Sequence, residues 1–194
     1  MKKLNILVAC ECSGKVRSAF RALGHNAYSC DIQPDDKDAN HPFHFRMDLM
    51  QVLNKKRWDL IVAFPPCTHL SASGARWWAD KEQEQKEAIA FVQTIMNADC
   101  DHIAIENPVG KLSTAIRKPD QYIQPWQHGH GETKKTGLWL KGLPLITPTN
   151  IVEGRSDRIH KMAPGPNRAK LRSETYDGIA NAIATQWSDH LLSI

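Results

Sequence analysis

The sequence predicts an α/β protein with a Rossmann-like fold, in which a mostly parallel central sheet carries helices on both faces. The apolar runs at 4–9 and 60–64 are short and continuous, as expected of strands buried on both faces of a parallel sheet. Segments whose apolar residues recur at helical spacing separate such runs. A glycine-containing turn at 10–14 follows the first run and makes, with the next helix, the first half of a βαβ unit.

The first unit is expected to contain a strand over 4–9 and a helix over 16–23, which Gly24 ends. We expect the N-terminus of this helix to leave backbone N–H groups free to meet a ligand. A second strand, 26–30, ends at Asp31. A carboxylate there can accept hydrogen bonds from the ribose hydroxyls of a nucleotide-like cofactor, and an ordinary turn aspartate is the alternative.

The run at 60–64 is followed directly by Pro65, Pro66 and Cys67. Proline cannot donate to a strand ladder, so the two prolines end the strand and hold the cysteine at its carboxyl end. Open α/β sheets bind their ligands at that edge. The small residues of 71–74 are typical of a closing loop. Cys67 is therefore either a positioned thiolate nucleophile or a half-buried structural cysteine.

Segment 59–74 resembles the catalytic motif of DNA cytosine-5 methyltransferases, in its Pro-Pro-Cys and in the Ser and Gly that follow at the family's spacing. Phe64 replaces a usual glycine and Thr68 a common glutamine. The resemblance implies that Cys67 attacks C6 of a cytosine. The other contacts implied here are Pro65 to the cofactor, and Pro66 and Ser71 to the substrate.

The turn at 11–14, Glu-Cys-Ser-Gly, resembles a divergent form of the same family's first cofactor motif. Cys10 and Cys12 stand where small residues or glycines are common. The resemblance implies the methyltransferase form of the Rossmann-like fold, with S-adenosylmethionine as cofactor. It implies that Asp31 binds the ribose and that Asp48 reads the adenine amino group. The full set of implied cofactor contacts is Cys12, Ser13, Gly14, Asp31, Asp48, Pro65 and Asn181.

A further buried strand is expected over 102–105, with Glu106 and Asn107 directly after it. A glutamate at a strand end is costly to bury without a partner, so acid–base work beside Cys67 is one explanation. A surface glutamate that caps the next turn is the other. In the family, the matching Glu-Asn pair supplies the glutamate that holds and protonates the N3 edge of cytosine. The resemblance thus implies a catalytic Glu106 and a substrate contact at Asn107.

A polar segment holds Arg76 and the tryptophan pair 77–78 before a helix expected over 81–97. The tryptophans suit base stacking or a lid, and equally a place in the core. Arg76 is a candidate phosphate contact.

A strand is expected over 136–140, and Lys134 and Lys135 precede it. The family usually carries a Gln-x-Arg-x-Arg motif near this point, so Lys135 is taken as a substrate contact. A lysine lacks the bidentate fork of arginine, and two solvated lysines are the alternative.

The segment 145–173 is basic and reads as a loop, and a last helix is expected over 175–192. A basic loop beside the site suits contact with a DNA backbone, and a solvated loop is the alternative. Asn181-Ala182 resembles the family's final motif. Family members carry a sizeable target-recognition domain, and here only 145–173 can take that place. We therefore expect a minimal, phage-like catalytic domain spanning 1–194, with a partner or an oligomer as a possible source of sequence recognition.

Composition is ordinary for a globular protein, with 41% hydrophobic and 24% charged residues and a net charge of +4. No run is apolar enough to span a membrane, and the N-terminal apolar stretch is too short for a signal peptide. Five cysteines without an extracellular spacing pattern favour free thiols in a reducing cytoplasm, that of the host if the chain is phage-encoded. No metal is expected, because Cys10-x-Cys12 with His25 and Cys30 departs from zinc spacing, and the pair at 128 and 130 has no further ligand nearby.

These residues together predict S-adenosylmethionine-dependent methylation of cytosine C5 in DNA, on a base flipped out of the duplex. Three alternatives stay open. The same chemistry can act on a free cytosine nucleotide, or the cofactor can be a modified one. The chain can also be a non-catalytic relic that binds DNA or cofactor.

Overall fold

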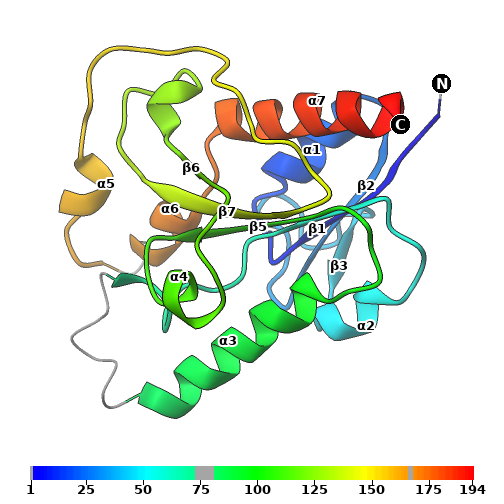
Figure 1. Cartoon of the computed structure of the whole chain (residues 1–194), viewed down its shortest axis with the longest axis horizontal. Coiled ribbons are helices and arrows are strands. Elements are labelled where there is room, and N and C mark those ends of the chain that lie inside the picture. The colour runs from blue at the N-terminus through cyan, green and yellow to red at the C-terminus, as the bar shows by residue number, and fades with distance from the viewer. Residues whose placement is uncertain (1, 73–80, 166–167) are drawn as a thin grey trace.

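The central sheet has seven strands among the described residues of a computed structural model, which covers 2–72, 81–165 and 168–194. Their order is β3-β2-β1-β4-β5-β7-β6 (Figure 1). The first five strands run parallel, and β7 runs antiparallel to both of its neighbours. The strands are β1 (Asn5–Ala9), β2 (Asn26–Asp31), β3 (His44–Arg46), β4 (Leu60–Ala63), β5 (Ile103–Pro108), β6 (Gln121–Ile123) and β7 (Thr136–Lys141).

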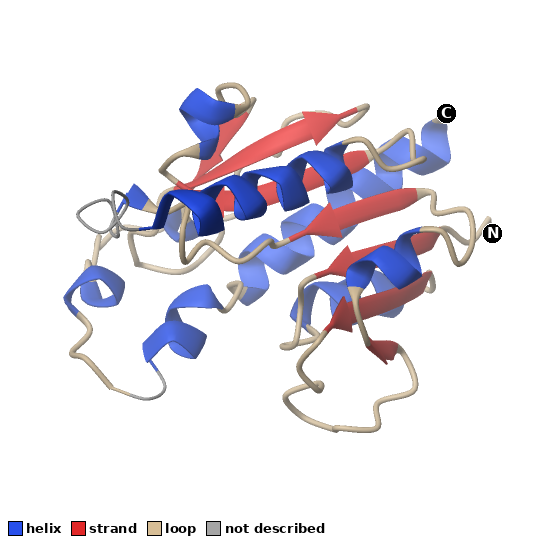
Figure 2. Cartoon of the chain, turned by 90° about the horizontal axis from the view of Figure 1, so that it is seen from below, coloured by secondary structure: helices blue, strands red, loops and turns tan. Residues whose placement is uncertain are grey.

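Helices cover both faces of this sheet, as Figure 2 shows, which confirms the predicted fold class. One face carries α1 and α7, and the opposite face carries α2 and α3. The helical elements are α1 (Lys15–Ala22), α2 (Leu49–Leu53), α3 (Glu82–Met96), α4 (Leu112–Ala115), the 3₁₀ turn η3 (Pro125–Gln127), α5 (Arg158–Lys161), α6 (Arg168–Ser173) and α7 (Asp177–Ser193).

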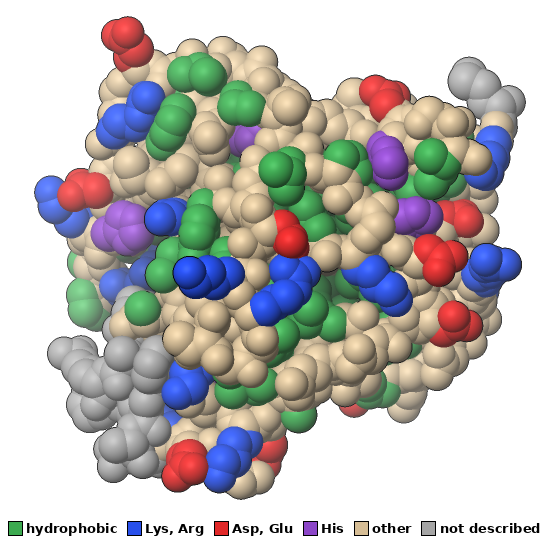
Figure 3. All heavy atoms as spheres, in the orientation of Figure 1, with side chains coloured by type: hydrophobic (Ala, Val, Ile, Leu, Met, Phe, Trp, Pro, Cys, Tyr) green, Lys and Arg blue, Asp and Glu red, His purple; other side chains and the backbone are tan. Residues whose placement is uncertain are grey.

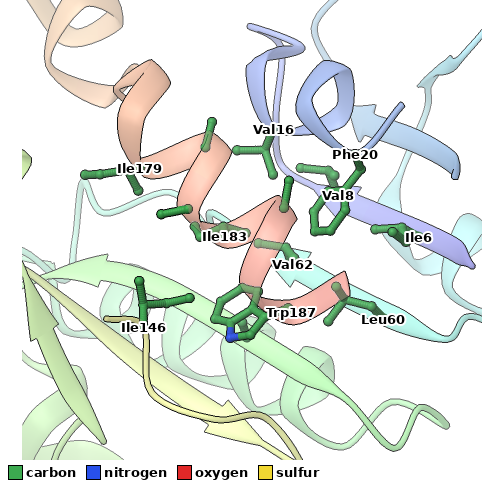
Figure 4. Packing of buried hydrophobic residues seen from close by; sticks show 14 of the residues in the cluster. Ile6, Val8, Val16, Phe20, Leu60, Val62, Ile146, Ile179, Ile183 and Trp187 are labelled. Atoms are coloured by element: carbon green, nitrogen blue, oxygen red, sulfur yellow. The ribbon is translucent and has the colours of Figure 1, made fainter. Parts of the chain in front are cut away.

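The core on the α1/α7 face is built around Trp187, which is fully buried (Figure 4). Ile179 and Ile183 lie on the same side of α7, because residues three and four apart share a helix face. They pack on Val8 and Val62 of the two central strands. The indole N–H of Trp187 donates to the carbonyl of Pro144 at 3.1 Å, so this helix also holds the chain that leaves β7.

Five short elements among the described residues were not predicted from sequence: β3, α2, α4, β6 and η3. Each has three to five residues, which is too short for hydrophobic periodicity to register. The expected strand over 102–105 is longer than predicted, because β5 continues through Glu106 to Pro108 and pairs with β7 over its whole length. The basic segment also contains α5 and α6 where only a loop was expected.

The order of the strands decides where a ligand can bind. The chain moves from β1 outward to β2 and β3, and then returns to place β4 on the other side of β1. The helices that follow β1 and β4 therefore lie on opposite faces, and sheets with this strand order bind ligands at the carboxyl ends of two such strands. The turn at 10–14 and the residues after Ala63 both lie at this edge.

Candidate active site

Cys67 lies just beyond the carboxyl end of β4, half-buried, on a shelf made by the two prolines. The backbone N–H of Phe64 donates to the carbonyl of Ala9, which fixes the start of the shelf against β1. Pro65 is buried beneath it and Pro66 is exposed. The N–H groups of Leu70 and Ser71 both donate to the carbonyl of Cys67, so the cysteine begins a tight turn.

Glu106 lies on the next strand, β5, on the sheet face that α7 covers. Its register partner is Leu138 of β7, a residue of the core on that face. Side chains alternate along a strand, so Thr136 and Lys134, which lie two and four residues before Leu138, face the same way as Glu106. These side chains line one recess at the carboxyl edge. Its residues are Phe64, Glu106, Ile123, Lys134, Thr136, Thr175, Tyr176 and Ile179.

The charges of this recess act on Cys67. Burial raises the pKa of the Cys67 thiol, and the nearby carboxylate of Glu106 raises it further. The Lys134 ammonium and the Arg172 guanidinium act in the opposite direction. Burial also raises the pKa of Glu106, against the opposing effects of Lys134 and of a hydrogen bond from Thr136. The fold thus brings together the thiol and the carboxyl that were singled out from sequence, with two cations beside them.

Lys135 does not face this recess. It follows Lys134 directly, so its side chain leaves the opposite face of the sheet, where its ammonium lies 4.2 Å from the centre of the Tyr122 ring. Of the two lysines considered from sequence, the structure places Lys134 beside Glu106. The alternation of side chains along β7 could have indicated this from sequence, because Leu138 is a core residue and shares the face of Lys134 and not that of Lys135.

Asn107 also lies away from the recess. Its side chain is 1% exposed, and its amide N–H donates to the carbonyl of Pro65 at 2.9 Å. Among the residues that the structure describes, the amide oxygen has no hydrogen-bond partner. The predicted substrate contact is instead a buried support of the shelf that carries Cys67.

The chain after Cys67 is held against the end of β5. Ser71 forms an isolated bridge with Gly110, and a Cβ on this glycine would lie 2.0 Å from the carbonyl oxygen of Leu70, so only glycine allows the approach. Ser71 therefore stays near the predicted site. Arg76, with the tryptophan pair 77–78, lies outside the described residues.

The turn at the end of β1 corrects one expectation from sequence. The first N–H groups of α1 are not free, because side chains from the preceding turn occupy them. Ser13 Oγ accepts from Lys15 N at 3.4 Å, and the Glu11 carboxylate accepts from Val16 N at 2.7 Å and Arg17 N at 3.3 Å. Glu11 is 4% exposed, and it escaped notice because a carboxylate four residues before a helix matches no familiar capping pattern.

The other predicted cofactor residues gather at this end of β1 and β2. Asp31 lies beside Cys12, whose thiol hydrogen-bonds to it, and burial together with this carboxylate raises the pKa of Cys12 to about 12. Gly14 has a φ of 64° and starts α1, and a Cβ there would lie 2.3 Å from a guanidinium nitrogen of Arg17. A side chain at this position would be strained by the positive φ and would have to displace the Arg17 guanidinium.

Asp48 and Asn181 are both exposed. Asp48 is the N-cap of α2 and accepts from Met50 N at 2.8 Å, and its charge also raises the pKa of Cys10. Asn181 lies one turn after Asp177, whose carboxylate pairs with Lys15 at the start of α1. The predicted position of Asn181 near the first turn is consistent with that pairing.

Through α6, the basic segment contacts the region of the turn after β1 and also acts on Cys67, which follows β4. Lys170 pairs with Asp36 at 2.6 Å, and the N–H of Asp36 donates to the carbonyl of Cys12. Arg172, two residues further on, acts electrostatically on Cys67. No residue of α6 is buried, so polar contacts hold this helix to the rest of the chain. Sequence reasoning identified the basic character of the segment but not which cations reach the site.

His128 and His130 have other partners. His128 contacts the hydroxyl of Thr149, and His130 accepts from the N–H of Gly178 at the start of α7. Within the described ranges, no three His, Cys, Asp or Glu side chains are placed to hold a metal ion. No helix in those same ranges has the length and apolar character needed to cross a membrane.

The fold is similar to those of two solved structures. One is an E. coli protein encoded within a prophage and provisionally assigned as a DNA modification methyltransferase, with a TM-score of 0.53 and 14% identity, over 78% of this chain and 52% of that one. The other is the methyltransferase EhMeth of Entamoeba histolytica, with a TM-score of 0.52 and 15% identity, over 86% of this chain and 62% of that one.

The chain therefore spans a little over half of the length of these two neighbours. At this level of identity the similarity establishes a methyltransferase-like fold. No protein-family model matches the sequence, and no curated protein matches it.

Proposed function

We propose that this chain transfers a methyl group from S-adenosylmethionine to C5 of a cytosine in DNA, through a covalent bond between Cys67 and C6. The observation that carries the proposal is the placement of Cys67 and Glu106 at the carboxyl ends of two adjacent parallel strands, where the Glu106 carboxylate acts to raise the pKa of the Cys67 thiol. A thiol and a carboxyl with a raised pKa are the two groups that addition to a cytosine ring requires.

The chemistry of the donors around the first turn fits S-adenosylmethionine. Asp31 keeps acceptor capacity for ribose hydroxyls, because its carboxylate has about four acceptor sites and the described contacts, from Gln33 N and the Cys12 thiol, fill two of them. Ile32, next to it, is 68% exposed and offers an apolar surface to a flat heterocycle. Asp48 and Asn181 supply further polar atoms toward this end of the sheet. When bound, the cofactor supplies a methyl group activated by a sulfonium.

The protein's own residues prepare the cytosine for this transfer. Glu106, whose carboxyl pKa is raised by burial, donates a proton to N3, while the thiolate of Cys67 adds to C6. C5 thereby becomes a nucleophilic carbon. Once C5 carries the methyl group and has lost its proton to a base, the bond from sulfur to C6 breaks, and N3 returns its proton to Glu106. Pro65 and Pro66 hold Cys67 in place throughout.

The cations beside the recess suit a polyanionic substrate. Lys134 and Arg172 both act on Cys67, so a phosphate or a base oxygen near the thiol meets positive charge. Figure 3 shows Lys and Arg side chains over the left half and the middle of one face of the molecule. We propose that segment 145–173 contacts the DNA backbone in a minimal, phage-like catalytic domain.

A covalent trap tests the proposal. The chain is mixed with S-adenosylmethionine and a duplex that carries 5-fluorocytosine, which blocks the final elimination, and adducts are sought by denaturing gel and intact mass. Cys67→Ser is the negative control. We expect an adduct in the wild type alone, with the added mass of the DNA and one methyl group.

Parallel reactions use a single strand and a free cytosine nucleotide. An adduct on one of these but not on the duplex would correct the substrate, and a different added mass would correct the transferred group. No adduct on any of the three would overturn the proposal.

A further inference from the structure

The N-terminus of α1 is the position where a Rossmann-like fold offers backbone N–H groups to an anion. In this chain the three N–H groups of the first turn point at protein atoms instead. One is bound by Ser13, and the N–H groups of Val16 and Arg17 are bound by the two oxygens of Glu11. The Glu11 carboxylate thus occupies the place that a phosphate or carboxylate of a ligand would take.

The arrangement suits an ionised Glu11. Both of its oxygens accept hydrogen bonds, and a protonated carboxyl would lose part of that capacity. Burial raises its pKa, while the Val16 and Arg17 N–H groups and the nearby Arg17 guanidinium oppose this. The positive end of the α1 dipole favours the same ionised form. A second anion brought to this end of α1 would meet a buried negative charge and no free N–H group.

The surroundings of the first turn are acidic as well. Asp31 and Asp48 both act on the thiol of Cys10, and Asp31 and Asp36 act on that of Cys12, in every case toward a raised pKa. The cations near this turn are already paired. Lys170 binds Asp36, Arg17 binds Asp35, and Lys15 binds Glu174 and Asp177.

We propose that Glu11 is a specificity-determining residue, which makes this end of the sheet select a cofactor with a positive charge and reject one that carries a phosphate. The inference rests on the proposed function and deepens it, because it states why a sulfonium nucleoside is accepted where a dinucleotide or nucleoside diphosphate is refused. It also predicts that the positively charged S-adenosylmethionine binds more tightly than its neutral product, S-adenosylhomocysteine.

The test measures binding to the full-length chain by titration calorimetry, with S-adenosylmethionine, S-adenosylhomocysteine and ADP as probes. Glu11→Ala frees the N–H groups of α1, whereas Glu11→Gln removes the charge and keeps an acceptor for them. We expect no measurable ADP binding to the wild type. In Glu11→Ala the affinity for ADP should rise roughly 5- to 30-fold, which corresponds to the ~1–2 kcal/mol that a partly buried anion gains at a helix N-terminus. In Glu11→Gln the preference for S-adenosylmethionine over S-adenosylhomocysteine should fall severalfold, with little gain in ADP binding.

The outcomes separate this inference from the proposed function. A folded Glu11→Ala variant that gains no ADP affinity, or a wild type that binds ADP, overturns the inference even if S-adenosylmethionine binds. A gain of ADP affinity in a chain that does not bind S-adenosylmethionine supports the role of Glu11 and removes the proposed cofactor. If Glu11→Ala does not fold, as judged by thermal melting, the cofactor preference of Glu11→Gln decides: an unchanged preference overturns the inference.

Discussion

The side chain of Asn107 donates a hydrogen bond of 2.9 Å to the carbonyl of Pro65, two residues before the cysteine of the proposed active site. Because Asn107 is 1% exposed, this bond supports the shelf from inside the protein. Asn107→Asp keeps the shape of the side chain and turns the donor into an acceptor that faces a carbonyl oxygen. We expect it to destabilise the chain by about 1–3 kcal/mol and to slow adduct formation, with little change in cofactor affinity.

Denaturant titration, rate measurements and cofactor titration check this expectation together. Trp187→Phe is the control for lost stability, because this residue lies in the core and away from the shelf. If both variants slow the reaction in proportion to lost stability, Asn107 has no specific role in positioning Cys67.

Glu106→Gln is expected to lower the pKa of Cys67. The charge of Glu106 is one of the causes that raise this pKa, and a neutral amide removes that cause while burial remains. The rate of alkylation of Cys67 by iodoacetamide, measured against pH, reports the pKa directly and needs no substrate. Cys67→Ser shows the background from the other thiols. An unchanged alkylation profile would contradict the electrostatic contact between the two residues.

The same pair predicts a bell-shaped dependence of adduct formation on pH. The reactive form holds one proton, on Glu106, and a thiolate on Cys67. Activity should rise as pH increases through the lower pKa of the pair, which lies above that of an ordinary glutamate. It should fall as pH increases through the upper pKa, which lies above that of an ordinary cysteine. If activity instead rose with pH through a pKa below that of an ordinary glutamate, Glu106 would be excluded as the proton donor.

Lys134 and Lys135 form a matched pair for mutation, since they are adjacent, directly precede β7 and point to opposite sides of the sheet. Lys134→Gln should slow adduct formation by about 10- to 100-fold, the loss expected when a charge-assisted hydrogen bond is removed. It should also raise the pKa of Cys67, because the ammonium acts to lower it. Lys135→Gln, whose cation lies over Tyr122, should stay within about twofold of the wild type. Equal losses in both variants would show that only overall charge matters.

Arg17 and Asp35 form a buried ion pair at 2.7 Å, with side chains 3% and 0% exposed. Asp35→Asn leaves a buried guanidinium unpaired, and we expect a loss of about 3–5 kcal/mol in unfolding free energy. Asp36→Asn breaks the more exposed pair with Lys170 and should cost less than about 1 kcal/mol. Urea titration of both variants at neutral pH makes the comparison, and equal losses would contradict the role of burial.

The ionisation of Asp35 also predicts the direction in which the unfolding free energy changes with pH. Burial acts to raise the pKa of Asp35, but hydrogen bonds from the Lys37 N–H and from Arg17 outweigh it, so the pKa lies below its ordinary value. The group therefore stabilises the fold above the unfolded-state pKa, and this contribution is lost as pH falls through the lower, folded-state pKa. The stability difference between wild type and Asp35→Asn should narrow as pH falls through that range. A difference that stays constant would show that Asp35 does not titrate with folding.

The sequence by itself determined the fold class and the neighbourhood of the site. Continuous apolar runs at 4–9 and 60–64 are typical of strands buried on both faces, and parallel strands put their carboxyl ends at one edge. Cys67 and Glu106 each follow such a run, so each was expected at the carboxyl edge of the sheet, and the family resemblance implied that they act on one base. Short elements such as β3 and β6 escaped prediction, because three residues carry too little periodicity.

Only the tertiary structure decided which face each side chain serves. A shift of one residue along a strand moves a side chain to the other face of the sheet. The register of β7 against β5 therefore decides whether Lys134 or Lys135 lies beside Glu106. The same pairing buries Asn107 under Pro65 and turns Glu106 toward the recess. The closed N-terminus of α1 depends likewise on how the turn brings Glu11 back onto Val16 and Arg17. Such contacts depend on strand register and turn geometry, because composition and spacing alone leave more than one arrangement open.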